Sequence, residues 1–419
     1  MAKKILTDED ISSIRFELGQ LFTPSAPIGV AELFAGRIGQ LSSLLAAVSE
    51  RGRHAVVYGE PGVGKTSLAQ TLQYFVPRKT SAVKFIRKAA FSSDTYSSIW
   101  LEIFRQIKFS ITTADGPKEY AVSDIYTTGV TPGDVVRELG YFSENDIPII
   151  VIDEFNLVAG SETSKQMAET IKAVSDAGLN ATIVVVGISD TVENLISGHN
   201  SVSRCTEEIL MPRMNNDEMK ILLERRLSKV EMSIVGDAKW KIINLSKGLP
   251  AFAHALGKGA ALSALRNRAL TLAEPDVDNA IVEILSGSQN SLKGAYELAT
   301  RSNQERSRHK QILTACAMAK TDESGFFTAK QVQEPLASIL RKTVGIDAFN
   351  PNLKEFSSAK RGNVLFQKGT ERVYRYRFEN PAMQPYVIMK GIQEGYLTEE
   401  AKLALSAPEQ GEFFSPNGF

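Results

Sequence analysis

One glycine-rich stretch of this 419-residue chain reads Gly59-Glu60-Pro61-Gly62-Val63-Gly64-Lys65-Thr66. It matches the pattern G-x-x-x-x-G-K-[ST] at every fixed position. Residues 54–58 before it are apolar enough for a short buried strand, and residues 67–72 after it have the character of a beginning helix. In this context the pattern cradles phosphates, because backbone N–H groups turn inward and the helix start adds unpaired donors.

Within this loop, we expect Lys65 to reach the β- and γ-phosphates of a bound nucleotide and the Thr66 hydroxyl to bind Mg²⁺. The expected nucleotide contacts of the loop are Gly59, Glu60, Pro61, Gly62, Val63, Gly64, Lys65, Thr66 and Ser67. The alternative is a glycine-rich turn that carries Lys-Thr by coincidence, and the flanking strand and helix count against it. The stretch therefore predicts a nucleoside triphosphate site.

A second informative stretch, residues 147–152, is an almost continuous β-branched run that ends in Asp153 and Glu154. Such a run is typical of a central strand in a parallel sheet that is covered on both faces. Two carboxylates at its end are costly to bury unless they have partners or a task. We expect Asp153 to hold Mg²⁺ through water and Glu154 to polarise the attacking water. A strand that merely ends in solvated acids is the alternative; beside the glycine-rich loop, the pair predicts ATP hydrolysis as well as binding.

The composition is that of a folded protein of two or three domains, with 43% hydrophobic and 23% charged residues. The 48 basic and 48 acidic residues cancel, so a nucleic-acid surface would have to be local. The two cysteines, Cys205 and Cys316, fit no metal-ligand spacing and favour a reducing compartment. The sequence has no apolar stretch of membrane-spanning length and no secretory pattern, so we expect a cytoplasmic protein without membrane contact.

Hydrophobic patterns along residues 54–211 alternate between strands and helices, which predicts βαβ units and a parallel sheet. The strands are expected at 55–58, 83–86, 148–152, 182–187 and 208–210. Residues 107–131 are polar and are expected to form a surface insertion.

The residues after 300 predict helices at 306–319, 329–336, near 340 and at 351–358, and then two strands around 368–370. This is the order of a winged helix-turn-helix. Its basic residues between 354 and 377 are Lys354, Lys360, Arg361, Lys368, Arg372, Arg375 and Arg377. A basic wing of this kind contacts DNA phosphates, but winged helices also bind proteins, and basic hairpins are often only solvated surfaces.

The glycine-rich loop (Walker A), the strand before Asp153 and Glu154 (Walker B), the strand at 182–188 and residues 201–204 together resemble the AAA+ ATPases. More narrowly, residues 20–390 are similar to the initiator and origin-recognition clade. The resemblance implies an α/β fold, with a P-loop NTPase parallel-sheet core, a helical lid and a C-terminal winged-helix domain. The implied domains are 1–30 (N-terminal helix and adenine-side segment), 31–212 (ATPase core), 213–300 (lid), 301–395 (winged helix) and 396–419 (acidic tail).

The same resemblance implies roles for residues outside the two motifs. Sensor 1, which would hold the γ-phosphate or the water, falls on Ser189 or Asp190; the family more often has Asn at position 190, so the choice stays open. Arg204 lies where the family places an arginine finger toward a neighbouring subunit, and an ordinary surface arginine is the alternative. The segment near the adenine is matched by Pro27, Ile28 and Arg37.

The chain departs from this clade at sensor 2, where it reads Gly248-Leu249-Pro250 and has no arginine. Gly-Leu-Pro is similar to the G-x-P element of the signalling STAND ATPases, whose proline packs near the nucleotide. His254, one turn further on, either faces the phosphates or is a packing histidine. The missing arginine predicts slow, switch-like turnover.

Two functions follow from these observations. In the first, the chain is an ATP-dependent homo-oligomeric AAA+ switch that presents its winged helix to double-stranded DNA or to a protein. In the second, it is a STAND-like signalling or defence ATPase that gates an effector protein acting in trans. The tail after Tyr396 is acidic and ends in a phenylalanine-containing stretch, and is expected either to be disordered or to dock on a partner or on the basic wing.

Overall fold

The computed structural model describes residues 6–24, 36–76, 82–113, 116–142, 146–196, 202–287, 290–302, 307–370, 373–405 and 407. The chain divides into two units. One unit consists of residues 27–212, and the other consists of residues 1–26 together with residues 213–419.

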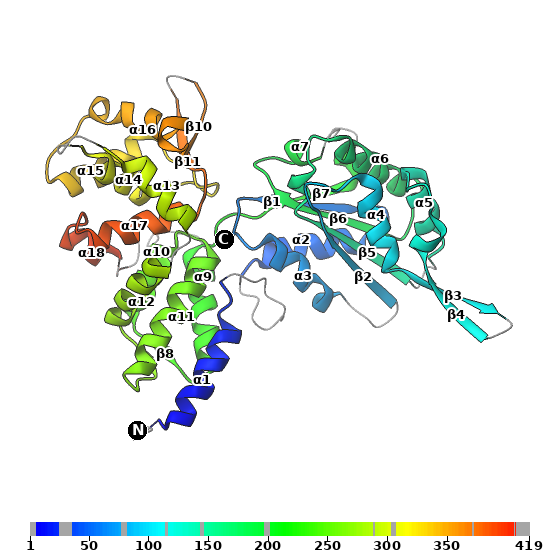
Figure 1. The fold of residues 1–419 in the computed structure, drawn as a ribbon, viewed down its shortest axis with the longest axis horizontal. Helices are drawn as coiled ribbons and strands as arrows, with labels where there is room; N and C mark the ends of the chain where they lie inside the picture. Colours follow the sequence, from blue (N-terminus) through cyan, green and yellow to red (C-terminus); the bar gives the residue numbers. More distant parts are fainter. Residues whose placement is uncertain are drawn as a thin grey trace, which may run out of the picture. The chain divides into compact units, whose positions relative to one another are not determined.

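A five-stranded sheet forms the centre of the unit at 27–212, and all its strand pairs are parallel (Figure 1). Its strands, in spatial order, are β2 (Ala82–Ala89), β5 (Asp146–Asp153), β6 (Thr182–Ile188), β1 (His54–Gly59) and β7 (Thr206–Leu210). The predicted parallel sheet is confirmed, with a strand over each of the five expected segments. Because β6 lies between β1 and β5, the residues after β6 emerge between the ends of the two motif-bearing strands.

Helices cover both faces of this sheet (Figure 1). They are α2 (Ile38–Ser49), α3 (Lys65–Phe75), α4 (Tyr96–Arg105), α5 (Pro132–Gly140), α6 (Glu162–Asp176) and α7 (Val192–Leu195). The apolar residues of α4 recur at helical spacing and pack with those of α6 against alternate residues of the strands, such as Ile86 and Ile152. The strand residues between these, such as Arg87 and Asp153, therefore point to the opposite face, on which α3 packs.

The predicted surface insertion contains an antiparallel hairpin, β3 (Lys108–Thr113) and β4 (Gly116–Ala121), which Figure 1 shows extending away from the sheet. Its strands were not predicted, because most of their side chains are exposed and polar, and the alternating apolar residues of β3 are just Phe109 and Ile111. Phe109 and Tyr120 stack across the hairpin with their ring centroids 6.0 Å apart.

The second unit begins with α1 (Asp8–Leu21), which Thr7 and Asp10 start with a capping box. It continues with α9 (Asn216–Ser228), β8 (Ser233–Ile234), α10 (Gly236–Ser246), α11 (Pro250–Arg266), β9 (Thr271–Leu272), α12 (Glu274–Gly287) and α13 (Asn290–Thr300). Helix α1 packs on α11, with Phe22 close to Gly257. The N-terminal helix thus belongs to the unit that holds the predicted lid helices.

The rest of this unit is α14 (His309–Met318), α15 (Ala329–Leu340), α16 (Asn350–Phe356), β10 (Leu365–Lys368), β11 (Arg375–Phe378), α17 (Met383–Gln393) and α18 (Glu399–Leu405). Phe327 adds an antiparallel bridge to Tyr376 of the β10–β11 hairpin. The separate helix expected near Leu340 is wrong: α15 continues through Pro335 to that residue, and a short 3₁₀ turn, Ile346–Ala348, follows.

The first part of the predicted acidic tail, 396–419, contains a helix. Residues 399–405 form α18, and the Leu405 side chain is buried. The Asn244 side chain of α10 donates hydrogen bonds of 2.9 Å to the carbonyls of Leu405 and Ala407. Residues 408–419 lie outside the described residues.

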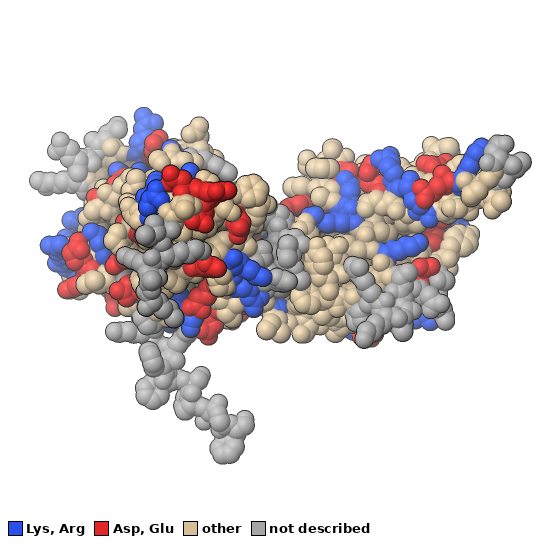
Figure 2. Space-filling view, turned by 90° about the horizontal axis from the view of Figure 1, so that it is seen from below, with Lys and Arg blue, Asp and Glu red and all other residues tan. Residues whose placement is uncertain are grey.

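Within the described ranges, no helix is both long and apolar enough to cross a membrane. Cys205 and Cys316 are both buried and form no disulfide. Figure 2 shows basic and acidic side chains interspersed on the face that it draws.

Candidate nucleotide-binding site

The phosphate loop connects the end of β1 at Gly59 to the start of α3 at Lys65. Its backbone has positive φ angles at three glycines, 142° at Gly59, 80° at Gly62 and 98° at Gly64. A Cβ atom on Gly59 would lie 2.5 Å from the carbonyl oxygen of Met211, so a side chain has no room there. The loop therefore takes a conformation that residues with a Cβ rarely adopt.

Lys65 is only 7% exposed, and its Nζ donates hydrogen bonds to the carbonyls of Gly59 (3.0 Å) and Glu60 (2.6 Å). Burial lowers the pKa of this ammonium to about 8, against the opposing effect of Glu154, Asp153 and Glu60. The charge is thus held inside the curve of the loop, where phosphate groups would give the ammonium negatively charged partners.

Asp153, at the end of β5, brings the second motif to the phosphate loop. Its side chain is 3% exposed. The Thr66 hydroxyl donates to its Oδ1 at 3.3 Å, and the Glu154 N–H donates to the same oxygen at 2.9 Å. The structure therefore brings together the two residues that were predicted to hold Mg²⁺. Hydroxyl and carboxylate oxygens are the ligands that this hard cation prefers, so the residues fit the metal.

Arg87 of β2 is one of two residues at this site that sequence reasoning missed. Its Nη2 lies 2.7 Å from Oδ2 of Asp153. The available signal was an arginine directly after the segment predicted as a strand, 83–86; in the structure that strand, β2, continues to Ala89.

Glu154 begins the turn after β5, with a φ of 56° and an exposed side chain. Asn156, in the same turn, was also missed; its Oδ1 accepts a hydrogen bond of 2.9 Å from the N–H of Ile188. This contact ties the turn that carries Glu154 to the end of β6.

Ser189 and Asp190 follow β6 directly, and Ile188 is in register with Gly59 of β1. Both predicted sensor residues therefore lie beside the phosphate loop. The Ser189 hydroxyl donates to the carbonyl of Thr191 at 2.6 Å, which holds this side chain in a local turn.

Arg37 is 3% exposed and contacts the back of the phosphate loop. Its Nη2 donates to the carbonyl of Val63 at 3.2 Å and to that of Pro212 at 2.5 Å. The other two residues predicted near the adenine, Pro27 and Ile28, lie outside the described residues.

Pro250 and His254 belong to α11 of the other unit, where Pro250 is the first helical residue. The His254 ring is 3% exposed, and its Nδ1 accepts a hydrogen bond of 3.0 Å from the N–H of Thr23. Burial lowers the pKa of His254 to about 3. His254 is thus a neutral packing histidine that joins α11 to the end of α1.

Arg204 is not brought to the phosphate loop. It precedes β7, whose first residue, Thr206, is in register with His54, the first residue of β1. Parallel strands share their direction, so Arg204 lies at the edge of the sheet opposite to Lys65. Its side chain is 66% exposed and forms an ion pair with Asp176 at the end of α6.

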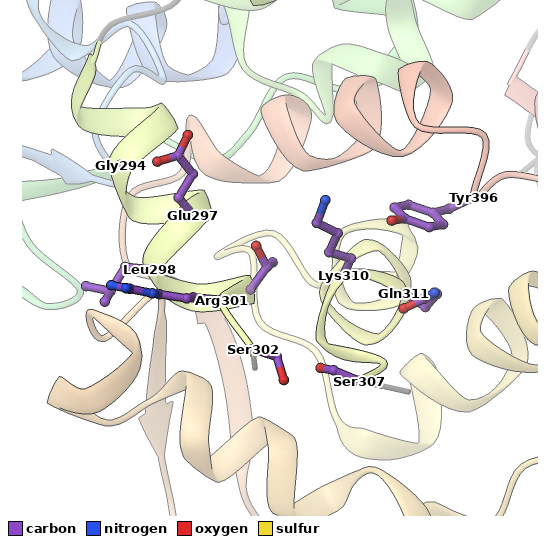
Figure 3. A pocket seen from close by; sticks show the side chains of 10 residues that line it. Gly294, Glu297, Leu298, Arg301, Ser302, Ser307, Lys310, Gln311 and Tyr396 are labelled. Atoms are coloured by element: carbon purple, nitrogen blue, oxygen red, sulfur yellow. The ribbon is translucent and has the colours of Figure 1, made fainter. Parts of the chain in front are cut away.

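A separate pocket of about 750 Å³ lies in the other unit, between α13, α14 and Tyr396 (Figure 3). Its Lys310 forms an ion pair of 2.9 Å with Glu394, and Figure 3 shows its serine side chains pointing away from Lys310. Two cations, Lys310 and Arg301, thus line the pocket, and Lys310 is already paired within the chain.

Comparisons with known proteins agree with this geometry. Residues 48–195 match the family model described as an AAA domain. The ORC2 protein of Aeropyrum pernix, solved as ADPNP–ADP complexes, is similar over 90% of this chain and 98% of its own, at 16% identity and a TM-score of 0.52. A Walker-type ATPase of Pyrococcus abyssi is similar over 88% of this chain and 99% of its own, at 16% identity and a TM-score of 0.50. The comparison with curated proteins found no match. The phosphate loop and the parallel strands thus lie in a region of which residues 48–195 match an AAA domain, and the chain has a fold similar to that of the Aeropyrum pernix ORC2 protein.

Proposed function

We propose that the chain binds and slowly hydrolyses Mg-ATP and acts as a nucleotide-dependent switch. The observation that carries this proposal is the contact between Thr66 and Asp153, because two residues 87 positions apart meet beside Lys65. A glycine-rich turn that matched the pattern by coincidence would not place a buried carboxylate beside the hydroxyl at the start of its helix.

In the proposed mechanism, the backbone of the phosphate loop holds the phosphates and Lys65 balances their charge. Thr66 and Asp153 would hold Mg²⁺, which supplies charge stabilisation to the transferring phosphoryl group when it is bound. Glu154 is exposed on the turn after β5 and orients the attacking water as the general base. Ser189 or Asp190, beside the loop, senses the γ-phosphate.

We further propose that Arg204 acts on the nucleotide of a neighbouring copy. Its position at the opposite edge of the sheet prevents it from reaching the nucleotide of its own chain, and its exposed guanidinium is available to a neighbour once Asp176 releases it. A planar cation at the γ-phosphate of a second subunit stabilises the charge of the transition state. ATP would then favour assembly.

The hairpin after α16 supports a winged helix as the surface that the switch presents. Tyr376 and Phe378 are buried, whereas Arg375 and Arg377 lie over the Phe326 ring, at 5.1 and 4.8 Å from its centroid. Lys354 of α16 lies over Tyr374 at 5.6 Å. One strand face thus carries cations on aromatic rings, a surface that suits DNA phosphates.

The test is size-exclusion light scattering of the Glu154→Gln protein, with and without Mg-ATP, each repeated with a short duplex DNA. We expect assembly with Mg-ATP, because the variant keeps the nucleotide bound, and recruitment of the duplex to the assembled form. Assembly that ignores DNA would favour the alternative function, in which the ATPase gates an effector protein. A protein that stays monomeric in all four samples would contradict the switch.

A further inference from the structure

The Arg87 guanidinium occupies one side of the candidate metal site. In β2, Ala89 is in register with Asp153 of β5, and Arg87 precedes it by two positions. Both Arg87 and Asp153 therefore point to the sheet face on which α3 packs. Their side chains are 33% and 3% exposed, so an ordered arginine at the rim pairs with a carboxylate that is buried.

The two oxygens of Asp153 have different partners. Oδ1 accepts from the Thr66 hydroxyl and the Glu154 N–H, and Oδ2 accepts from Nη2 of Arg87 at 2.7 Å. A cation that approaches this carboxylate meets the positive charge of Arg87 on the Oδ2 side. Each of two cations beside one carboxylate lowers the affinity of that carboxylate for the other cation. Their mutual repulsion is strong because it acts in a partly buried, weakly screened site.

The guanidinium has a donor that Asp153 does not use. Its Nε is buried and has no hydrogen-bond partner among the described residues. Nε and Nη2 form one edge of the planar group, and only Nη2 is used by Asp153. An anion with two acceptor oxygens, such as a phosphate, would pair both donors in the fork geometry that arginine favours.

We propose that Arg87 is an internal counter-ion of the metal carboxylate, which must give way when Mg²⁺ and the nucleotide enter together. Arg87 is a positioning residue in this proposal: it acts through Asp153 and sets how strongly nucleotide binding depends on Mg²⁺. The proposal rests on the proposed function in one respect, since it takes Asp153 to be the carboxylate that serves Mg²⁺.

The test compares the wild-type chain with Arg87→Gln by equilibrium titration of a fluorescent ATP analogue, once in excess Mg²⁺ and once in EDTA. The ratio of the dissociation constant in EDTA to that in excess Mg²⁺ reports the coupling between metal and nucleotide. We expect this ratio to be about tenfold larger in Arg87→Gln, because removal of the competing charge favours Mg²⁺. Arg87→Lys keeps the charge and should lie close to wild type.

Arg105→Gln is the matched control, because Arg105 is an exposed arginine at the end of the neighbouring α4 and forms a local ion pair with Glu102. It should leave the ratio unchanged. An unchanged or smaller ratio in Arg87→Gln overturns the proposal; a smaller ratio would mean that Arg87 supports metal binding. If the wild-type chain binds no nucleotide in either buffer, the proposed function fails instead. If Arg87→Gln does not fold, Arg87→Met, which also removes the charge, takes its place with the same expected rise in the ratio.

Discussion

Lys65→Met should make the nucleotide-free protein slightly more stable while abolishing its response to ATP. The pKa of Lys65 falls from its ordinary value of 10.5 to about 8, with burial as the largest cause. At 1.36 kcal/mol for each pKa unit, keeping this ammonium charged in the folded protein costs about 3 kcal/mol at pH 7. The substitution also removes two hydrogen bonds to carbonyls, each worth about 1 kcal/mol. The expected net gain is therefore about 1 kcal/mol.

The assay is urea unfolding of both proteins. The transition to compare is the one whose midpoint shifts when nucleotide is added to the wild-type protein. At 100 times its dissociation constant, Mg-ATP should raise the unfolding free energy of the wild-type protein by about 2.7 kcal/mol and leave Lys65→Met unchanged. The order of the two stabilities thus reverses when ATP is added. A variant that is less stable than wild type without nucleotide, or that still gains stability from ATP, would refute this reasoning.

The pH dependence provides an independent check on the same residue. The folded pKa of Lys65 is lowered, so between about pH 8 and 10.5 the unfolded chain keeps a proton that the folded chain has lost. The unfolding free energy of the wild-type protein should therefore rise with pH across this window, relative to that of Lys65→Met. Above about pH 10.5, Lys65→Met should no longer have a higher unfolding free energy than the wild-type protein.

Three further predictions concern Gly59 of the phosphate loop and two residues away from it, His254 and Arg204. Gly59→Ala should abolish nucleotide binding, measured with a fluorescent ATP analogue, since its Cβ would lie 2.5 Å from the Met211 carbonyl oxygen; binding at wild-type strength would contradict the loop geometry. The folded pKa of His254 is lowered to about 3, so the unfolded chain binds a proton first as pH falls below 6.5, and acid unfolding should begin in that range and be weaker in His254→Gln. Arg204→Ala should lower ATPase activity about a thousandfold in the assembled protein and leave the ATP affinity of the monomer near wild type, and equal losses in both would remove its role in trans. Asp176→Ala, which frees Arg204 from its ion pair, is the matched variant and should keep that activity.

The local chemistry of the phosphate loop and of the β5 strand was readable from sequence, because their patterns depend on near neighbours. Glycines that must adopt positive φ, a lysine at the start of a helix and a β-branched run that ends in acids all carry their meaning within about ten residues. The parallel sheet followed from the alternation of such segments. Most of the helices after residue 300, and the hairpin among them, could also be predicted in outline, since each of these elements has its own periodicity.

Contacts between distant segments were decided only by the tertiary structure. Arg87 meets Asp153 because β2 pairs with β5 in one particular register, and a shift of one residue would turn the arginine to the other face. His254 is a packing residue because the chain after α1 brings the Thr23 N–H to its ring. The end of α18 is held at α10 by a hydrogen bond that the Asn244 side chain donates to the Leu405 carbonyl. Arg204 lies far from Lys65 because every strand of the sheet runs in the same direction. Register, strand direction and the docking of helices are set by the packing of the whole chain, and no short pattern in the sequence encodes them.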